Sequence, residues 1–350
     1  MNAHHRQALR PSATIARQSR RLTGVTLIEL MVALTIGSFL LIGAVTVLMH
    51  SKTAFRVLES VSRLQENARF ALDALEPDIR MASYFGLTSR SDKIQGRATP
   101  QAPIPPGLHV GNDCGANWTI NVTEEVSGTN NAYRWSCPAF GRAAQPAADS
   151  FVVRRVNANP VAPPLEGGTL YVQSARFQDS QLFVGPSVPA GYLPATSQTY
   201  RFTVNGYYVS AHSSLDTPGN SVPSLRVKTL VGGARGPRIV DQEVLPGVED
   251  FQVQFGIDTD VAGAAARGSI NRYVNPGDPI LDPFRAAFNP DATILAVRIW
   301  VRLRAERPEN GFTDTMSYTY ADQIVPAPND HFRRIVISKT IYLRNARLPI

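Results

Sequence analysis

The feature of this sequence that most constrains its fold is an apolar run over residues 25–49 that contains a single charged residue, Glu29. A helix of these 25 residues would be about 37 Å long at 1.5 Å per residue, and the hydrocarbon core of a bilayer is about 30 Å thick. An ordinary secretory signal has a shorter apolar core, of roughly 7–15 residues, followed by a cleavage site of small residues. Here the run is longer, and Gly24 precedes it. The sequence therefore predicts a transmembrane helix over 25–49.

The charges on either side of the run predict its orientation. Lys52 and Arg56 follow the run and are soon balanced by Glu59, whereas before it stand five arginines and no acid: Arg6, Arg10, Arg17, Arg20 and Arg21. Because basic flanks stay in the cytoplasm, we expect the residues after the span to lie outside the inner membrane. A carboxylate inside a span costs about 2.5–3.5 kcal/mol on insertion-based scales, so Glu29 is expected to have a partner.

The start of the span resembles the class III signal of type IV prepilins. Residues 24–29 read G-V-T-L-I-E, close to the pattern G-[FM]-[TS]-L-[IV]-E, with Val25 where that family usually has Phe or Met. The resemblance implies that a prepilin peptidase cleaves between Gly24 and Val25 and methylates the new amine of Val25. It also implies that Glu29 attracts the amine of a neighbouring subunit during docking. Two alternatives stay open, a plain uncleaved signal anchor and a Glu29 that only extends toward the cytoplasmic face.

The helix is predicted to continue beyond the membrane. Apolar residues recur at spacings of three and four, which is typical of an amphipathic helix: Val57, Val61, Leu64, Ala68, Leu72 and Leu75. Pro77 should kink or end this helix. We therefore expect one N-terminal helix over 25–82, transmembrane in 25–49, after a basic leader over 1–24.

Residues 83–149 are rich in Pro, Gly, Asn and Ser and are predicted to be irregular loop. The chain has two cysteines, Cys114 and Cys137, which can pair in an oxidising compartment. A bridge closing this loop would contribute about 3 kcal/mol by loop entropy. The alternative is two unpaired buried thiols. Trp118 and Trp135 lie in the same segment and are interpreted as local core rather than a surface for stacking a ligand.

From residue 150 onward the pattern predicts strands, separated by turns that contain Gly and Pro. Several alternate between apolar and polar residues, as half-buried antiparallel strands do. The expected strands are 151–156, 169–173, 199–210, 224–231, 239–245, 248–257, 294–304 and 334–343. The predicted fold class is α+β, a long N-terminal helix packed on a mainly antiparallel β head domain over 150–350, as in pilins.

Further stretches resemble the PilW family of minor pilins. Residues 248–260 read V-E-D-F-Q-V-Q-F-G-I-D-T-D, and residues 296–302 and 333–345 resemble two later strands of that family. Residues 65–70 and 78–82 are similar too. The resemblance covers both ends of the mature chain and is weak in 83–148 and 263–290.

This resemblance implies a minor pilin that takes part in type IV pilus assembly, in an initiation or tip complex with other minor pilins. The implied partners are the prepilin peptidase, other minor pilins, the major pilin and the inner membrane. The protein would be a single-pass inner-membrane protein with its head in the periplasm, and later part of the pilus fibre. The alternatives are a J-type minor pseudopilin of a type II secretion system, a DNA-uptake pilin and a membrane-anchored periplasmic domain.

Other function classes find little support in the sequence. Removal of residues 1–24 lowers the net charge from +7 to +2, so the basic balance gives little reason to expect nucleic-acid binding. No catalytic motif, phosphate-binding loop or zinc pattern is present, so we expect no enzymatic activity, no cofactor and no small-molecule substrate.

The sequence leaves alternatives open for an aspartate pair and for a set of three arginines. Asp258 and Asp260 resemble the start of a calcium loop, although Ala262 stands at the third acidic position; the alternative is a solvated turn. Three arginines, at 298, 302 and 304, alternate along one strand. They are expected to form a solvated sheet face or to meet acids of a neighbouring subunit.

Overall fold

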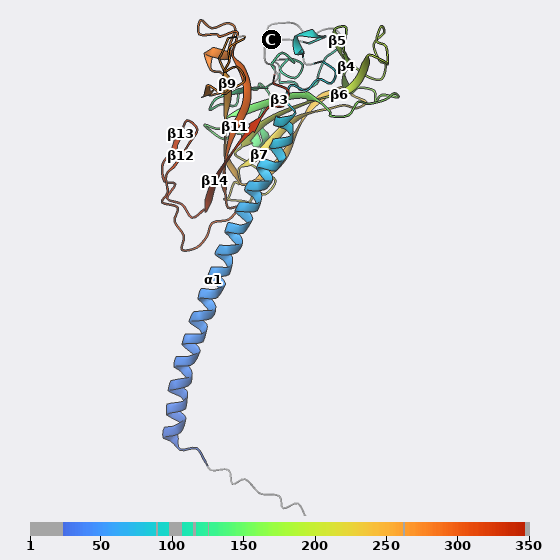
Figure 1. The fold of residues 1–350 in the computed structure, drawn as a ribbon. Coiled ribbons are helices and arrows are strands. Elements are labelled where there is room, and N and C mark those ends of the chain that lie inside the picture. Colours follow the sequence, from blue (N-terminus) through green and yellow to red (C-terminus); the bar gives the residue numbers. More distant parts are fainter. Residues whose placement is uncertain are drawn as a thin grey trace, which may run out of the picture. The chain divides into compact units, whose positions relative to one another are not determined.

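The computed structural model describes residues 24–346 except Ser89, 98–106, 115–116, Glu125 and Ala262. The predicted leader over 1–24 therefore lies outside the described residues apart from Gly24. The chain divides into two compact units between Leu58 and Glu59. Helix α1 (Leu27–Arg80) begins in the first unit and ends in the second, which also contains all the strands (Figure 1).

In the first unit, α1 is the one helix among the described residues that is long and apolar enough to cross a membrane. Its apolar side chains are exposed along this part, including Leu27 at 77% and Phe39 at 76%. A soluble helix would bury one apolar stripe, whereas a helix that is apolar on all sides suits lipid. The predicted span over 25–49 therefore agrees with the exposed apolar surface of α1.

In the second unit, α1 buries the predicted stripe. Leu64, Ala68 and Leu75 are buried as expected, and Ala71 is fully buried whereas its neighbour Leu72 is only partly so. Pro77 lies in the last turn, and the helix ends three residues later at Arg80. Asp78 in this turn is buried and accepts hydrogen bonds from Arg155 (2.6 Å), Asn205 (2.9 Å) and Tyr207 (2.9 Å). The end of the helix is thereby fixed to two strands of the head.

The larger sheet has eight strands in the described part of the chain. The order is β1-β5-β4-β6-β3-β2, with β7 paired to β6 and β8 paired to β7. Strand β6 is the longest, so it can pair with three different strands along its length. The bounds are β1 (Ile94–Gln95), β2 (Val126–Thr129), β3 (Ser150–Val156), β4 (Leu170–Ala175), β5 (Ser180–Val184), β6 (Ser197–Ser210), β7 (Ser224–Val231) and β8 (Arg238–Pro246).

A smaller antiparallel sheet follows in the order β10-β9-β11-β14. Its strands are β9 (Val248–Asp258), β10 (Arg272–Val274), β11 (Thr293–Arg304) and β14 (Arg334–Tyr342). A separate hairpin consists of β12 (Tyr318–Tyr320) and β13 (Gln323–Val325). All eight strands expected from the sequence are present with small shifts of their ends, which confirms the predicted α+β class.

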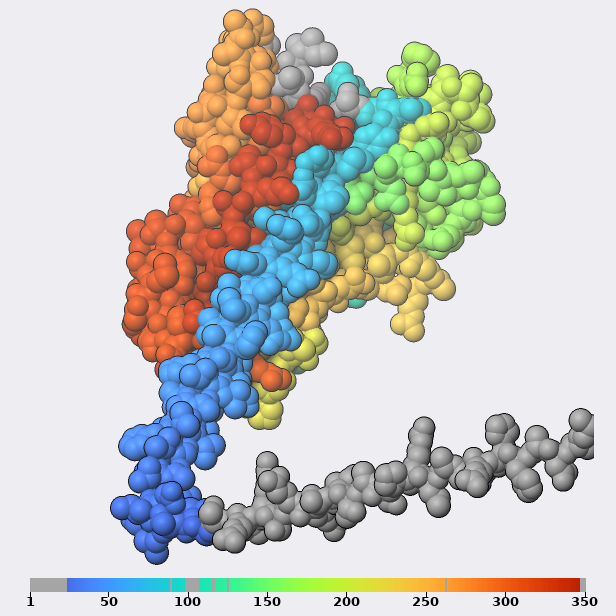
Figure 2. Space-filling view, turned by 60° about the horizontal axis from the view of Figure 1, so that its bottom comes forward, coloured from blue at the N-terminus to red at the C-terminus, as the bar shows by residue number. Residues whose placement is uncertain are grey.

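The buried stripe of α1 shares one core with the inner faces of both sheets. Phe151 and Val209 come from the larger sheet, and Phe251, Val297 and Ile299 from the smaller one. Figure 2 shows this part of α1 lying between the C-terminal strands, coloured red, and the strands coloured green and yellow. The helix therefore supplies apolar surface to a core in which the two sheets also contact each other directly, as Phe151 and Phe255 do with ring centroids 6.1 Å apart.

Apolar residues among the described part of 84–122 form a second core on the opposite face of the larger sheet. Phe85, Leu108 and Trp118 are buried there against Val152 and Phe202. The segment 83–149 also contains β1, β2 and the short 3-10 helices Ser91–Lys93 and Phe140–Arg142. The loop expected over 83–149 is thus interrupted by these short elements, and its scattered apolar side chains fold onto a face that would otherwise be exposed.

The arginines of β11 are neither solvated nor left to a neighbouring subunit. Arg302 and Arg304 have side chains only 11% and 13% exposed, at 3.3 and 3.6 Å from the carboxylate of Glu249. Arg334 of β14 binds the same carboxylate with two nitrogens, at 2.7 and 2.9 Å. Arg298 instead stacks on Tyr273, 3.7 Å from its ring centroid. The expected alternatives were wrong because the chain supplies its own acids and aromatic ring.

A buried carboxylate joins the turn after β2 to β9. Asp149 is 1% exposed and accepts backbone N–H groups of Asn131 and Val253, both at 2.7 Å. Burial raises the pKa of Asp149 to about 7, an effect that the two N–H groups oppose and that the carboxylates of Asp322 and Asp250 reinforce. Because the ordinary pKa of Asp is about 3.9, the native state holds this proton more tightly than the unfolded chain does.

This raised pKa predicts a stability change between about pH 4 and pH 7. The stabilisation by protonated Asp149 is full below about pH 4 and is lost as the pH rises to about 7, at about 1.4 kcal/mol per pKa unit. Asp149→Asn should remove this part of the pH dependence of the free energy of unfolding, measured with urea in detergent. Glu66→Gln, at an exposed position on α1, is the control and should leave it unchanged. A variant Asp149→Asn with the full pH dependence of the wild type would contradict the assignment.

Candidate functional site

The start of α1 forms a reciprocal hydrogen-bonded cap. Glu29 Oε2 accepts hydrogen bonds from the backbone N–H of Thr26 (2.9 Å) and from its hydroxyl (2.8 Å). The Thr26 hydroxyl in turn accepts the N–H of Glu29 at 3.3 Å. This is a capping box, which satisfies donors that the first turn of a helix leaves free. Sequence reasoning missed Thr26, although Thr followed by Glu three residues later is the usual signal for this cap.

The cap brings together the residues predicted to carry the function. Gly24 and Val25 directly precede Thr26, and Val25 is 70% exposed. No atom of the described residues lies within 4 Å of the position that a Cβ of Gly24 would occupy. Glu29 lies in the first turn of α1, where a negative charge also complements the helix dipole. Cleavage after Gly24, methylation of Val25 and docking through Glu29 stay predictions.

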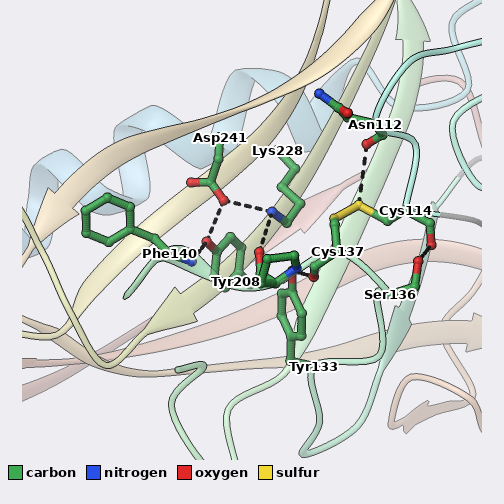
Figure 3. The surroundings of a disulfide bond; sticks show 10 residues. Asn112, Cys114, Tyr133, Ser136, Cys137, Phe140, Tyr208, Lys228 and Asp241 are labelled. Carbon is green, nitrogen blue, oxygen red and sulfur yellow. Dashed lines mark hydrogen bonds and ion pairs between the residues drawn. A yellow bond between two sulfur atoms is a disulfide. The ribbon is translucent and has the colours of Figure 1, made fainter. Parts of the chain in front are cut away.

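Cys114 and Cys137 are joined by a disulfide, with Cα atoms 4.7 Å apart, within the usual range for such bridges (Figure 3). Ser136 donates its backbone N–H to the carbonyl of Cys114 at 3.3 Å. Tyr133 donates its hydroxyl to the carbonyl of Cys137 at 2.7 Å. The bridge therefore ties two distant turns of the 83–149 segment to one another.

A charged and aromatic cluster lies beside the disulfide on the face of β7 and β8 (Figure 3). Lys228 and Arg226 contact the carboxylate of Asp241 at 2.8 and 2.7 Å, and the Tyr208 hydroxyl donates to it at 2.6 Å. Burial would raise the pKa of Asp241, but hydrogen bonds from Lys228, Tyr208 and Arg226 together hold it below its ordinary value. Every charge in this cluster therefore has a partner within the chain.

Trp118 and Trp135 pack on each other beside this cluster, with ring centroids 5.4 Å apart. Trp118 belongs to the second core and Trp135 packs against it. The structure thus places both rings in local packing, as interpreted from the sequence, rather than on an open stacking surface.

The Asp258–Asp260 turn is not arranged as a calcium loop, and it is not a solvated turn either, because Asp258 is fully buried. The two carboxylate oxygens of Asp258 accept backbone N–H groups of Asp260 (2.8 Å) and Gly268 (2.6 Å). The guanidinium of Arg267 donates to the carbonyl of Asp260, which puts a positive charge where a cation would need oxygen ligands. Within the described ranges, no group of three His, Cys, Asp or Glu side chains is placed to hold a metal ion.

Comparison with known families matches two parts of the chain. The model described as "Type IV Pilus-assembly protein W", PilW, matches residues 206–345, which include β7, β8, β9, β11 and β14. The prokaryotic N-terminal methylation motif matches residues 20–45, which include the capping box. Together the two matches support a PilW-family type IV pilin, a minor pilin with a role in type IV pilus assembly, as the sequence stretches had implied.

Other comparisons add little to the PilW assignment. Among solved structures, the chain is similar to the type IV-like pilin TTHA1219 from Thermus thermophilus, with 14% sequence identity over 81% of this chain and 96% of that chain, and a TM-score of 0.33. No curated protein matches the chain. The assignment therefore depends on the two family models.

The disulfide gives a direct test of the folded head of this PilW-family protein. A non-reducing peptide map should recover Cys114 linked to Cys137. Replacing both cysteines by serine should lower the free energy of unfolding by about 3 kcal/mol, because the bridge restricts the unfolded chain. Reductant should destabilise the wild type by a similar amount and leave the double variant unchanged. Free reaction of both thiols with an alkylating agent in denatured, unreduced protein would show that the bridge is absent.

Proposed function

We propose that this PilW-family pilin starts assembly of the pilus fibre or forms its tip, in a complex with other minor pilins. The observation that supports this most is the start of α1, where the Gly24–Val25 junction stands directly before a capped helix of membrane-spanning length. On this proposal, α1 holds the protein in the inner membrane and the head lies in the periplasm until the subunit enters the fibre. A prepilin peptidase first removes the leader.

Leader removal would convert the Val25 amide into a free amine two residues before the N-terminal turn of α1. An amine and a carboxylate attract each other strongly in a low-dielectric setting, because little water screens them. The carboxylate of Glu29 has Thr26 as its own partner in the isolated chain. A docking neighbour's amine would therefore share or replace the hydrogen bonds between Thr26 and Glu29. Its attraction to the carboxylate would offset the free-energy cost of holding Glu29 in the membrane.

The first test of this proposal is the processing of the leader. Mass spectrometry of the membrane-extracted protein should give an N-terminus at Val25 carrying a methyl group. Gly24→Leu, which blocks the junction with a bulky side chain, should leave the leader attached. Intact Met1 on the wild-type protein, in cells with an active prepilin peptidase, would instead indicate a plain signal anchor.

The second test concerns the charge of Glu29. Glu29→Ala and Glu29→Gln should each reduce the number of pili per cell at least several-fold, because both remove the attraction for a neighbour's amine. The head should stay folded, the leader should be cleaved, and the protein should accumulate in the membrane fraction on immunoblots.

Two Thr26 variants separate the charge from the helix cap. Thr26→Ser keeps both the cap and the charge and should assemble normally. Thr26→Ala weakens the cap by about 1 kcal/mol but keeps the carboxylate, so it should retain most pili. Wild-type pilus numbers in Glu29→Ala cells would show that Glu29 is only a tolerated membrane carboxylate.

A further inference from the structure

Strand β8 lies at an edge of the larger sheet, and its outer side is only partly paired within the described part of the chain. It pairs with β7 on one side, and within the described part of the chain its other side meets only an isolated bridge between Gly111 and Arg238. In this bridge Gly111 donates its N–H to the carbonyl of Pro237, and Ile239 donates its N–H to the carbonyl of Gly111, both at 2.8 Å. The backbone of Ile239 therefore points away from β7.

Among the residues that the structure describes, the next outward-facing backbone groups of β8 have no such partner. Backbone N–H and C=O groups alternate sides along a strand, so those of Asp241 and Glu243 share the open side with Ile239. The register between β7 and β8 is regular from Arg238 to Glu243 and shifts only after it. No backbone carbonyl in the described part of the chain accepts a hydrogen bond from the N–H groups of Asp241 and Glu243 on that side. Unpaired edge groups of this kind readily accept another strand.

The segment that borders β8 turns away where the open edge begins. Asn112 and Cys114 have φ values of 56° and 63°, in the left-handed region, so the chain leaves the strand direction after Gly111. The disulfide then holds this turn against Cys137 (Figure 3). The result is an open hollow of about 680 Å³ beside β8, lined in part by Asn112, Cys114, Pro138 and Val240.

The side chains of this edge do not block an added strand. Residues 239–245 contain neither Lys nor Pro, the residues that commonly protect edges. The carboxylates of Asp241 and Glu243 are neutralised by Arg226 and Lys228, so they would not repel a partner. The other long edge strand, β14, is instead tied to α1 by the Lys339–Glu76 ion pair, and the chain just after β14 is tied to it by the N–H of Arg344 on the carbonyl of Arg80.

We propose that an extended segment of another minor pilin adds to β8 as an extra strand, in line with residues 109–111. This inference rests on the proposed assembly with other minor pilins and names the surface that it uses. The added backbone would pair with Asp241 and Glu243. Its side chains on one face would meet Val240 and Val244, which are half-buried, and therefore should be apolar.

A matched pair of substitutions separates the backbone from the side chain at this edge. Glu243→Pro removes the outward N–H, whereas Glu243→Ala keeps it, and both remove the same carboxylate from Arg226 and Ser214. The two full-length variants should have equal unfolding midpoints. Glu243→Pro should nevertheless lower the number of pili per cell at least several-fold relative to Glu243→Ala. Equal pilus numbers in the two variants would overturn the proposal.

Amide hydrogen exchange tests the pairing itself. In the minor-pilin complex purified from membranes, the amides of Asp241 and Glu243 should exchange at least tenfold more slowly than in the isolated full-length protein. A photo-crosslinking residue at Gln242 should join an extended segment of another minor pilin, identified by mass spectrometry. Unprotected amides, or a crosslink to a second copy of this chain or to an unrelated protein, would overturn strand addition. In that case, cleavage of the leader and the dependence of pilus number on Glu29 would still test the pilin function separately.

Discussion

The head of this protein depends on the burial of one helical stripe between two sheets. Ala71, Leu75 and Ile79 are fully buried, and the inner faces of the larger and smaller sheets meet them in a single core. Neither sheet covers its own inner face, so removing the helix would expose apolar residues of both. This is why α1 must continue past the membrane-length segment, and why the same helix serves as both anchor and core.

Polar groups fix the position of this helix and of the loops around it. Asp78 ties the last turn of α1 to β3 and β6, and Asp149 ties the turn after β2 to β9. Buried polar groups of this kind are costly unless each has a partner, so they specify one arrangement of the layers. The Glu249 cluster does the same for the long connection between β11 and β14, through Arg334, Asp314 and Asp330. The apolar core supplies most of the stabilisation, and these polar networks specify how the helix, the sheets and the loops are arranged around it.

The features that connect the fold to pilus assembly lie at two places in the chain. At the start of α1, a capping box holds the single carboxylate of the apolar run beside the residue that leader removal would expose. In the head, the chain turns away at the disulfide, and part of the β8 edge is unpaired by any residue that the structure describes. The first is suited to a charge-based contact between helices and the second to a backbone contact between heads. Each unit therefore offers a contact of a different physical kind.

The sequence alone determined the long helix, the eight long strands and the stretches that identify the family, because each depends on local periodicity or on a short contiguous motif. It also limited the two cysteines to one possible bridge, whereas the structure decided that Cys114 and Cys137 are joined. Tertiary structure decided the partners of Arg302 and Arg304, the raised pKa of Asp149 and the open edge of β8. Glu249 lies more than fifty residues from Arg302 in sequence, and Asp149 about a hundred from Val253. No local pattern carries such contacts, because they exist only once distant strands and turns pack together.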